Sequence, residues 1–165
     1  MFEASDAVSV GRVIHSDVGH AVNQDKISHD LEIVPGGDSG GCYDFVHNAV
    51  AGALQLLIPK LPSLQVYPLQ GSGYKIQKYP KGEGKFNWHF DALGPETQKR
   101  LLALILYLDD VEQGGETEFF YQGLKVQPKA GNAIMFPTAW THMHCGHVPV
   151  SSDKYIVSSF FYFVI

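Results

Sequence analysis

The sequence predicts a mainly β protein with one flanking helix, whose strands form an antiparallel sandwich or jelly roll. After Pro62 the chain consists of short runs rich in Val, Ile, Tyr, Phe and Leu, separated by turns that contain Gly, Pro or Asp. This punctuation is typical of antiparallel strands. Before these runs lies one stretch in which apolar residues recur at helical spacing.

The elements are expected in a simple order along the chain. Residues 1–41 are rich in Gly, Asp, Ser and His and show little periodicity, so they predict an irregular lead-in. The helical pattern covers residues 43–58, with Asp38, Ser39 or Asp44 as candidate caps and Pro59 at its end. The β core is expected over 64–165, which makes residues 1–165 a single domain of ordinary size.

Two runs in the β core have distinct expected places in the sheet. Residues 101–108 are nearly all apolar, as expected for a central strand that is covered on both faces. Residues 154–165 form a long closing strand at the end of the sequence. Both runs are expected to position side chains inside the core.

Charge and cysteine content bear on partners and compartment. The net charge of -5 is scattered along the chain, so it gives no footprint for nucleic acid or for an anionic membrane. Two cysteines without regular spacing predict neither a disulfide framework nor a structural zinc site. We expect a soluble, unsecreted, cytoplasmic protein, and nothing in the sequence bears on its oligomeric state.

A His-x-Asp pair is the first candidate for chemistry. His89 and Asp91 are two residues apart, so in a strand both point to the same face and can hold one ion. A third ligand is expected later in the chain, where His142, His144 and His147 are available. Two His and one carboxylate on one side of an ion form the site of non-haem Fe(II) oxygenases. Histidines satisfied by hydrogen bonds alone are the alternative at this point.

Further residues extend this pattern in order along the second half of the chain. The sequence resembles the prolyl-4-hydroxylase family of Fe(II)- and 2-oxoglutarate-dependent oxygenases. The resemblance rests on Tyr79-x-x-Gly82, His89-x-Asp91, Arg100, Tyr107-Leu108, Gly114-Gly115-Glu116-Thr117-x-Phe119, Pro128-x-x-Gly131-x-Ala133-x-x-Phe136, His144-x-Gly146, Pro149-Val150 and Lys154-Tyr155. It implies a double-stranded β-helix core, of the jelly-roll, cupin-like type, with the helix packed outside as a buttress.

The resemblance also favours one of the three histidines. In this family the distal metal His usually precedes the cosubstrate-binding basic residue by nine or ten positions, and 154 minus 144 is 10. His144 is therefore the predicted ligand beside His89 and Asp91, with His142 as second choice. Pro149 lies one position later than the family pattern has it, which predicts a one-residue bulge after His144.

Roles for the other matched residues follow from the resemblance. Lys154 is expected to bind the distal carboxylate of 2-oxoglutarate, because a buried cation needs an anionic partner. Tyr79 and Tyr107 are expected to donate hydrogen bonds to the cosubstrate, and Thr117 is a weaker candidate for the same pocket. The substrate-binding candidates are Arg100 and Phe160. Phe160 stands where these hydroxylases commonly carry Trp, which leaves the prolyl substrate open.

The implied activity is hydroxylation of an unactivated C–H bond, most simply that of a prolyl residue in a peptide or protein. Fe(II), 2-oxoglutarate and O2 are the implied cofactors and cosubstrates, with ascorbate as a candidate reductant. No catalytic side chain beyond the metal ligands is expected. Two alternatives stand beside this interpretation: an oxygenase that acts on a free amino acid or other small molecule, and a non-oxidative, cupin-like metal-binding module.

Overall fold

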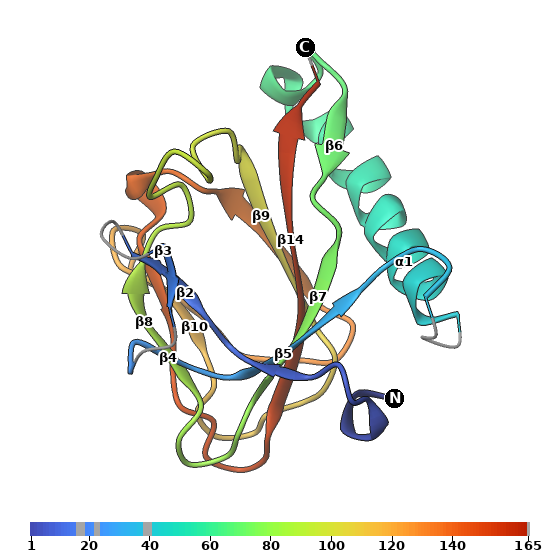
Figure 1. Ribbon diagram of the computed structural model, residues 1–165. Coiled ribbons are helices and arrows are strands. Elements are labelled where there is room, and N and C mark those ends of the chain that lie inside the picture. Colours follow the sequence, from blue (N-terminus) through green and yellow to red (C-terminus); the bar gives the residue numbers. More distant parts are fainter. Residues whose placement is uncertain (16–18, 22–23, 38–40, 165) are drawn as a thin grey trace.

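Two antiparallel sheets face each other, and α1 lies against the outer side of the larger one (Figure 1). The computed structural model describes residues 1–15, 19–21, 24–37 and 41–164. The larger sheet has seven strands in the order β1-β5-β7-β14-β9-β12, with β6 beside β14, and the smaller has five in the order β11-β10-β13-β8-β4. This arrangement confirms the predicted mainly β, jelly-roll fold class with a flanking helix.

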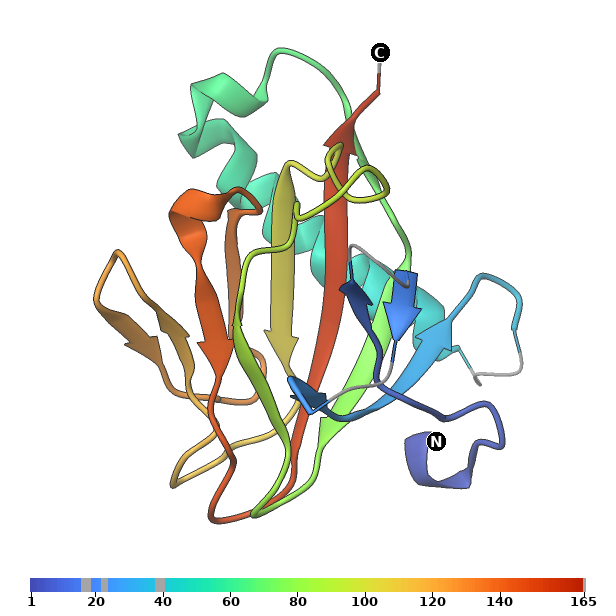
Figure 2. The ribbon, with the colours of Figure 1, turned by 60° about the vertical axis from the view of Figure 1, so that its left-hand side comes forward.

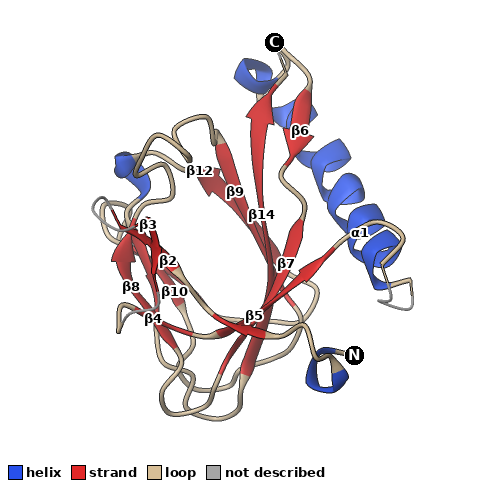
Figure 3. Ribbon diagram, in the orientation of Figure 1, coloured by secondary structure: helices blue, strands red, loops and turns tan. Residues whose placement is uncertain are grey.

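The bounds of the elements define these layers, and Figure 3 shows the helices outside the two sheets. The larger sheet comprises β1 (Ser9–Val10), β5 (His29–Ile33), β6 (Leu69–Gly71), β7 (Tyr74–Tyr79), β9 (Leu102–Tyr107), β12 (Ala133–Pro137) and β14 (Lys154–Phe163). The smaller sheet comprises β4 (Lys26–Ile27), β8 (Lys85–His89), β10 (Thr117–Phe119), β11 (Leu124–Val126) and β13 (His144–Gly146). The remaining elements are the hairpin β2 (Val13–His15) and β3 (Gly19–Ala21), the helix α1 (Cys42–Leu57), and the 3-10 helices η1 (Phe2–Ala4), η2 (Ile58–Lys60), η3 (Pro62–Leu64) and η4 (Trp140–His142).

β14 is the central strand of the larger sheet and crosses in front of α1 in the view of Figure 2. It pairs with β7, β9 and β6, and Lys154 at its start lies opposite Tyr79. Its side chains alternate, so that Val157 and Phe161 pack toward α1 whereas Ile156 packs between the sheets. The predicted closing strand is thus the element that carries side chains to the interior.

α1 covers the larger sheet through Val46 and Val50, which are buried in one core cluster with residues of β9 and β14. The helix agrees with the expected 43–58 to within one residue at each end. Gly41 precedes it in the left-handed region with φ 79°, and Asp44 lies in its first turn, where a negative charge is favourable. Asp38 and Ser39, the other candidate caps, lie outside the described residues.

The prediction of an irregular lead-in over residues 1–41 is wrong. This segment contains η1 and the strands β1 to β5, and β5 joins the larger sheet beside β7. The apolar signal of β5 is only two residues long, Leu31 and Ile33, because its other face carries the polar Asp30 into the core. The β core therefore begins well before residue 64.

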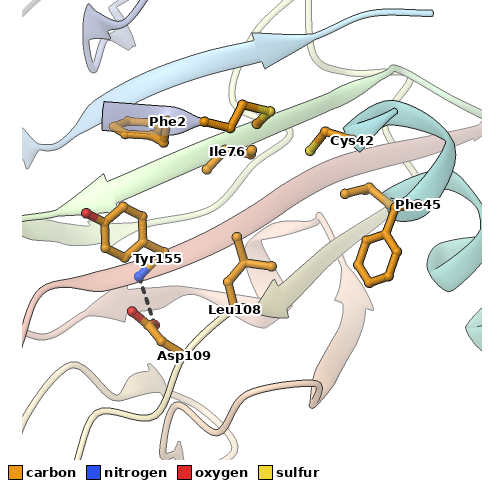
Figure 4. A pocket seen from close by; sticks show the side chains of 9 residues that line it. Phe2, Cys42, Phe45, Ile76, Leu108, Asp109 and Tyr155 are labelled. Carbon is orange, nitrogen blue, oxygen red and sulfur yellow. Dashed lines mark hydrogen bonds between the residues drawn. The ribbon is translucent and has the colours of Figure 1, made fainter. Parts of the chain in front are cut away.

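The N-terminal turn packs on the outside of the larger sheet and lines an apolar hollow of about 310 Å³ (Figure 4). Phe2 makes an edge-on contact with Tyr155, and the Tyr155 amide donates to Asp109 Oδ1 at 3.0 Å. None of the predicted site residues lines this hollow, so the candidate site lies elsewhere. Among the described helices, none has the length and apolar character needed to cross a membrane.

Candidate metal centre and cosubstrate pocket

His89, Asp91 and His144 come together at one end of the smaller sheet. His89 on β8 lies directly opposite His144 on β13, and their ring centroids are 4.2 Å apart. The Asp91 carboxylate reaches both rings, with Oδ1 3.8 Å from His89 Nε2 and Oδ2 3.9 Å from His144 Nε2. One nitrogen or oxygen from each residue lies within 4.8 Å of the others, as a single bound ion requires.

A local irregularity of β8 turns His89 into the interior. Opposite β13, Gly146 pairs with Phe86 whereas His144 pairs with His89, so β8 carries one residue more than its partner over this stretch. Phe86 and His89 therefore both face inward and stack, with centroids 3.5 Å apart. Trp88 between them is exposed. An irregularity does occur just after His144, but the extra residue lies on β8.

Asp91 lies just beyond the end of β8 rather than within the strand. Its backbone N–H donates to the Thr138 carbonyl at 3.1 Å, which fixes the turn that follows His89. The His-x-Asp spacing still brings both side chains to one side, although the turn, and not a regular strand, directs the carboxylate.

The hydrogen bonds of the two rings leave one nitrogen of each free for an ion. His89 Nδ1 lies 2.7 Å from the Asn87 carbonyl and His144 Nδ1 lies 2.9 Å from the His142 carbonyl. Because a carbonyl only accepts, Nδ1 carries the proton in each ring, and Nε2 presents its lone pair toward Asp91. Burial, with His144 nearby, holds the pKa of His89 well below its ordinary value, which favours the neutral, ligating form.

The Asp91 carboxylate has one buried oxygen that a bound cation would satisfy. Its Oδ2 is the one buried side-chain oxygen or nitrogen without a hydrogen-bond partner among the described residues. Burial raises its pKa, although His144 and Arg100 act in the opposite direction. Two imidazole nitrogens and one carboxylate on one side of an ion fit Fe(II). The residues present therefore fit the implied metal.

His142, the second choice for the distal ligand, takes another role. Its ring nitrogen Nδ1 lies 3.1 Å from Thr141 Oγ1, and its side chain lines a hollow outside the His–Asp–His group. Its backbone carbonyl is the acceptor that orients His144. The structure thus brings His144, and not His142, to Asp91.

Lys154 is a buried cation that forms no ion pair with the residues the structure describes. Its side chain is 2% exposed, its Nζ donates to the Gly115 carbonyl at 2.9 Å, and Nζ lies 4.6 Å from the centroid of the Tyr79 ring. Within the described part of the chain no carboxylate forms an ion pair with it, and burial lowers its pKa to about 8. A buried cation is costly without an anion, so the position of Lys154 suits an anionic ligand.

The two predicted tyrosines and Thr117 line the same interior. Tyr79 and Tyr107 are buried in one cluster with Ile156, and Tyr107 donates to Thr117 Oγ1 at 2.8 Å. Burial raises the pKa of Tyr107 to about 12, so its phenol remains a hydrogen-bond donor at neutral pH. The structure therefore brings both phenols to the inner side of the larger sheet, with Lys154.

Arg100 and Phe160 form a pair beside Asp91. The guanidinium carbon of Arg100 lies 3.7 Å from the centroid of the Phe160 ring, and Nη1 donates to the Asp91 carbonyl at 3.4 Å. Phe160 and Lys154 are six residues apart on β14, which is about 20 Å along a strand. The predicted substrate residues and the predicted cosubstrate anchor thus occupy different ends of the interior.

The sequence analysis missed a buried polar cluster that closes the interior on the β4–β5 side. Asp30 Oδ2 lies 2.8 Å from Lys26 Nζ, and Asp30 also accepts hydrogen bonds from Ser28 and Gln77. The ion pair joins the edge of the smaller sheet to the larger one. Polar side chains at every second residue, Lys26, Ser28 and Asp30, were the available signal for a strand with a polar inner face.

Comparison with known proteins places this geometry in a family. The model of the 2OG-Fe(II) oxygenase superfamily matches residues 74–162, which is more than half of the chain. The chain belongs to the 2OG-Fe(II) oxygenase superfamily. Fe(II), 2-oxoglutarate and O2 are the cofactors and cosubstrates that membership implies, and the cupin-like, non-oxidative alternative is set aside. All eight predicted site residues lie inside the matched range; Lys26 and Asp30 lie outside it.

Relatives and solved structures agree with this membership. A probable prolyl 4-hydroxylase 9 of Arabidopsis thaliana is 29% identical over 144 residues, covering 71% of this chain and 46% of the relative. A prolyl hydroxylase of Trichoplax adhaerens, solved with a hypoxia inducible factor peptide fragment, has a TM-score of 0.74 at 17% identity, covering 96% of this chain and 71% of that one. The viral collagen prolyl hydroxylase of Paramecium Bursaria Chlorella virus-1, solved with 2OG, has a TM-score of 0.67 at 21% identity, covering 85% of this chain and 81% of that one.

These likenesses differ in what they establish. The two solved structures are distant in sequence, so they establish the double-stranded β-helix fold of the superfamily. The chain spans less than half the length of the curated relatives it matches. The superfamily and fold are thus settled, whereas the substrate is a matter for proposal.

Proposed function

We propose that this chain is a 2-oxoglutarate-dependent hydroxylase whose substrate is a prolyl residue in a peptide or protein. The observation that carries the proposal is the pairing of two incomplete sites in one interior. Among the described residues, Asp91 Oδ2 has no hydrogen-bond partner beside two free imidazole nitrogens, and Lys154 forms no ion pair. A metal ion satisfies the first site, and a dicarboxylate that reaches from the metal to the lysine satisfies the second.

Each residue has a separate task in this proposal. His89, Asp91 and His144 would hold Fe(II), and Lys154 would hold the distal carboxylate of 2-oxoglutarate as a point charge. Tyr79 would supply a neutral hydrogen-bond donor to the cosubstrate, because burial raises the pKa of its phenol. The phenol of Tyr107 is also neutral, and it would donate to the cosubstrate by turning its O–H away from Thr117. When bound, Fe(II) with 2-oxoglutarate and O2 supplies the oxidising chemistry that inserts oxygen into a C–H bond and yields succinate and CO2.

Apolar side chains limit water around the metal ligands. Phe136 and Phe119 pack against the His144 ring with centroid distances of 4.7 and 5.6 Å, and Phe86 stacks on His89. A dry site strengthens the electrostatic interactions inside it and limits side reactions. No side chain is needed as a nucleophile, so the protein's part is to ligate, orient and exclude water.

The prolyl peptide is favoured by the Arg100–Phe160 pair and by the names of the relatives. Arg100 presents a guanidinium that donates to peptide carbonyls, and Phe160 keeps the aromatic face on which a pyrrolidine ring can pack. Three curated Arabidopsis relatives are named prolyl 4-hydroxylases or probable ones. A free amino acid or another small molecule is the alternative substrate, which the same metal site would serve.

Mass spectrometry of peptide libraries tests the substrate. With Fe(II), 2-oxoglutarate, ascorbate and O2, we expect an added oxygen on a prolyl residue, with succinate formed in equal amount. The matched controls are the same peptide with Ala in place of Pro, and the His89→Ala variant with the original peptide. Succinate production that no prolyl peptide stimulates, but that a free amino acid does, would move the assignment to the alternative substrate.

A further inference from the structure

A second set of metal-ligand atoms lies on the face of β13 opposite to the His144 side chain. Because successive side chains of a strand alternate, Cys145 points away from the iron centre when His144 points toward it. Cys145 is paired directly with Glu118 on β10, and His147 follows just beyond the end of β13. The backbone N–H of His147 donates to the Glu116 carbonyl at 2.9 Å, which holds it beside β10.

The three side chains converge on one point. His147 Nε2 lies 2.5 Å from Glu118 Oε2 and 3.7 Å from Cys145 Sγ, and all three donor atoms lie within 4.8 Å of one another. In a tetrahedral zinc site with ordinary bond lengths, neighbouring donor atoms lie about 3.3 to 3.6 Å apart. The sulfur–nitrogen pair is already near this separation, and the carboxylate needs to withdraw from the imidazole by about 1 Å.

The arrangement of Glu118, Cys145 and His147 suits a metal site better than a catalytic relay with Cys145 as nucleophile. A Cys–His–acid relay uses the two ring nitrogens separately, one toward the thiol and the other toward the acid. Here the same nitrogen, His147 Nε2, faces both Cys145 and Glu118. One sulfur, one nitrogen and one oxygen around a common centre are the donor types that bind zinc.

We propose that Glu118, Cys145 and His147 form a binding site for a divalent metal of zinc type, separate from the iron centre. The site has three protein ligands and an open fourth position, and it joins β10 to β13. Cys145 is buried, whereas the Glu118 and His147 side chains are 24% and 38% exposed, so the metal has a path from solvent.

Lys125 competes weakly with a metal ion for the Glu118 carboxylate. Lys125 Nζ lies 3.2 Å from Glu118 Oε2, and the Lys125 side chain is 57% exposed. An ion pair at this level of exposure contributes little, so a divalent cation can displace the ammonium at small cost.

Cobalt is the probe that separates the two sites. We expect the metal-free chain to bind two equivalents of Co²⁺, one of which gives a near-ultraviolet thiolate-to-cobalt charge-transfer band that Zn²⁺ abolishes on addition. Cys145→Ser should lose this band and one equivalent of cobalt, and His89→Ala should lose the other equivalent and keep the band. Cys42→Ser is the matched control. Cys42 is the other cysteine of the chain, and its replacement should leave the band unchanged.

The two less buried ligands keep the test valid if Cys145→Ser does not fold. His147→Gln and Glu118→Gln should each weaken cobalt binding at the charge-transfer site by at least about tenfold, since even residues that merely orient a metal ligand contribute that much. The proposal is overturned if the native chain shows no thiolate band, if the band persists in Cys145→Ser, or if Cys42→Ser abolishes it. None of these outcomes depends on hydroxylase activity.

Discussion

Replacing Lys154 by Met should make the metal-free and cosubstrate-free protein more stable while it weakens 2-oxoglutarate binding. Burial lowers the pKa of Lys154 from 10.5 to about 8, which corresponds to about 3 kcal/mol against the charged form in the folded state. Loss of the charged hydrogen bond to the Gly115 carbonyl offsets about 1.5 kcal/mol or more of that gain. The expected rise in unfolding free energy at neutral pH is therefore at most about 1.5 kcal/mol.

The pH dependence of the unfolding free energy tests the sign of the Lys154 contribution independently. The folded state has the lower pKa, so between about pH 8 and pH 10.5 the unfolded chain binds more protons at this residue, and stability from Lys154 rises with pH. Urea denaturation across this pH range should show that the difference in unfolding free energy between Lys154→Met and the wild-type chain becomes smaller as the pH rises. Met at the exposed Lys60 is the control, and should change stability by less than about 0.5 kcal/mol.

Binding supplies the other half of the same prediction. A hydrogen bond to a charged group contributes about 1.5–3 kcal/mol, so Lys154→Met should raise the dissociation constant of 2-oxoglutarate about 10- to 100-fold, as measured by calorimetry with the metal present. A variant that is less stable than the wild type and that binds 2-oxoglutarate normally would refute the reasoning, because it would make Lys154 a structural residue.

Three further predictions concern the metal ligand, the phenol and the aromatic platform. Fe(II) affinity in anaerobic titrations should fall as the pH is lowered, beginning above the range of an ordinary carboxylate, because burial raises the pKa of Asp91; a profile that stays flat down to that range would contradict this. Tyr107→Phe should destabilise the protein to urea by about 1–2 kcal/mol, because Thr117 Oγ1 loses its partner at 2.8 Å, and adding Thr117→Val should recover most of the loss; no recovery would show that the hydroxyl pair is not responsible. Phe160→Ala removes the ring that lies 3.7 Å from the guanidinium, so KM for a prolyl peptide should rise while the dissociation constant of 2-oxoglutarate stays unchanged; equal loss of both would assign Phe160 to the fold.

The part of the site that could be predicted is the part that regular strands carry. Lys154 and Tyr79 are opposite each other in the β14–β7 pairing, and Tyr107 lies on the apolar strand β9, so strand alternation alone sends them inward. The spacing between His144 and Lys154 is likewise local, because these residues lie on two consecutive strands joined by one turn. Such local relations are present in the sequence.

The part that could not be predicted depends on pairing between distant segments. β5 has only two apolar residues on its outer face, and Asp30 on its inner face is tolerable only because Lys26 and Gln77 surround it. The extra residue in β8 is visible only against β13, its partner more than 50 residues later in the chain. The bulge leaves no periodic signal in its own segment, and the alternating polar residues Lys26, Ser28 and Asp30 do not by themselves show that Lys26 and Asp30 pair.

The most direct test of the central claim is anaerobic visible spectroscopy of the chain with Fe(II) and 2-oxoglutarate. We expect a weak charge-transfer band that requires both additions, that disappears in His89→Ala, and that needs a higher 2-oxoglutarate concentration in Lys154→Met. Absence of the band in the wild-type chain, or its persistence in His89→Ala, would contradict the assignment of His89, Asp91 and His144 as the iron site.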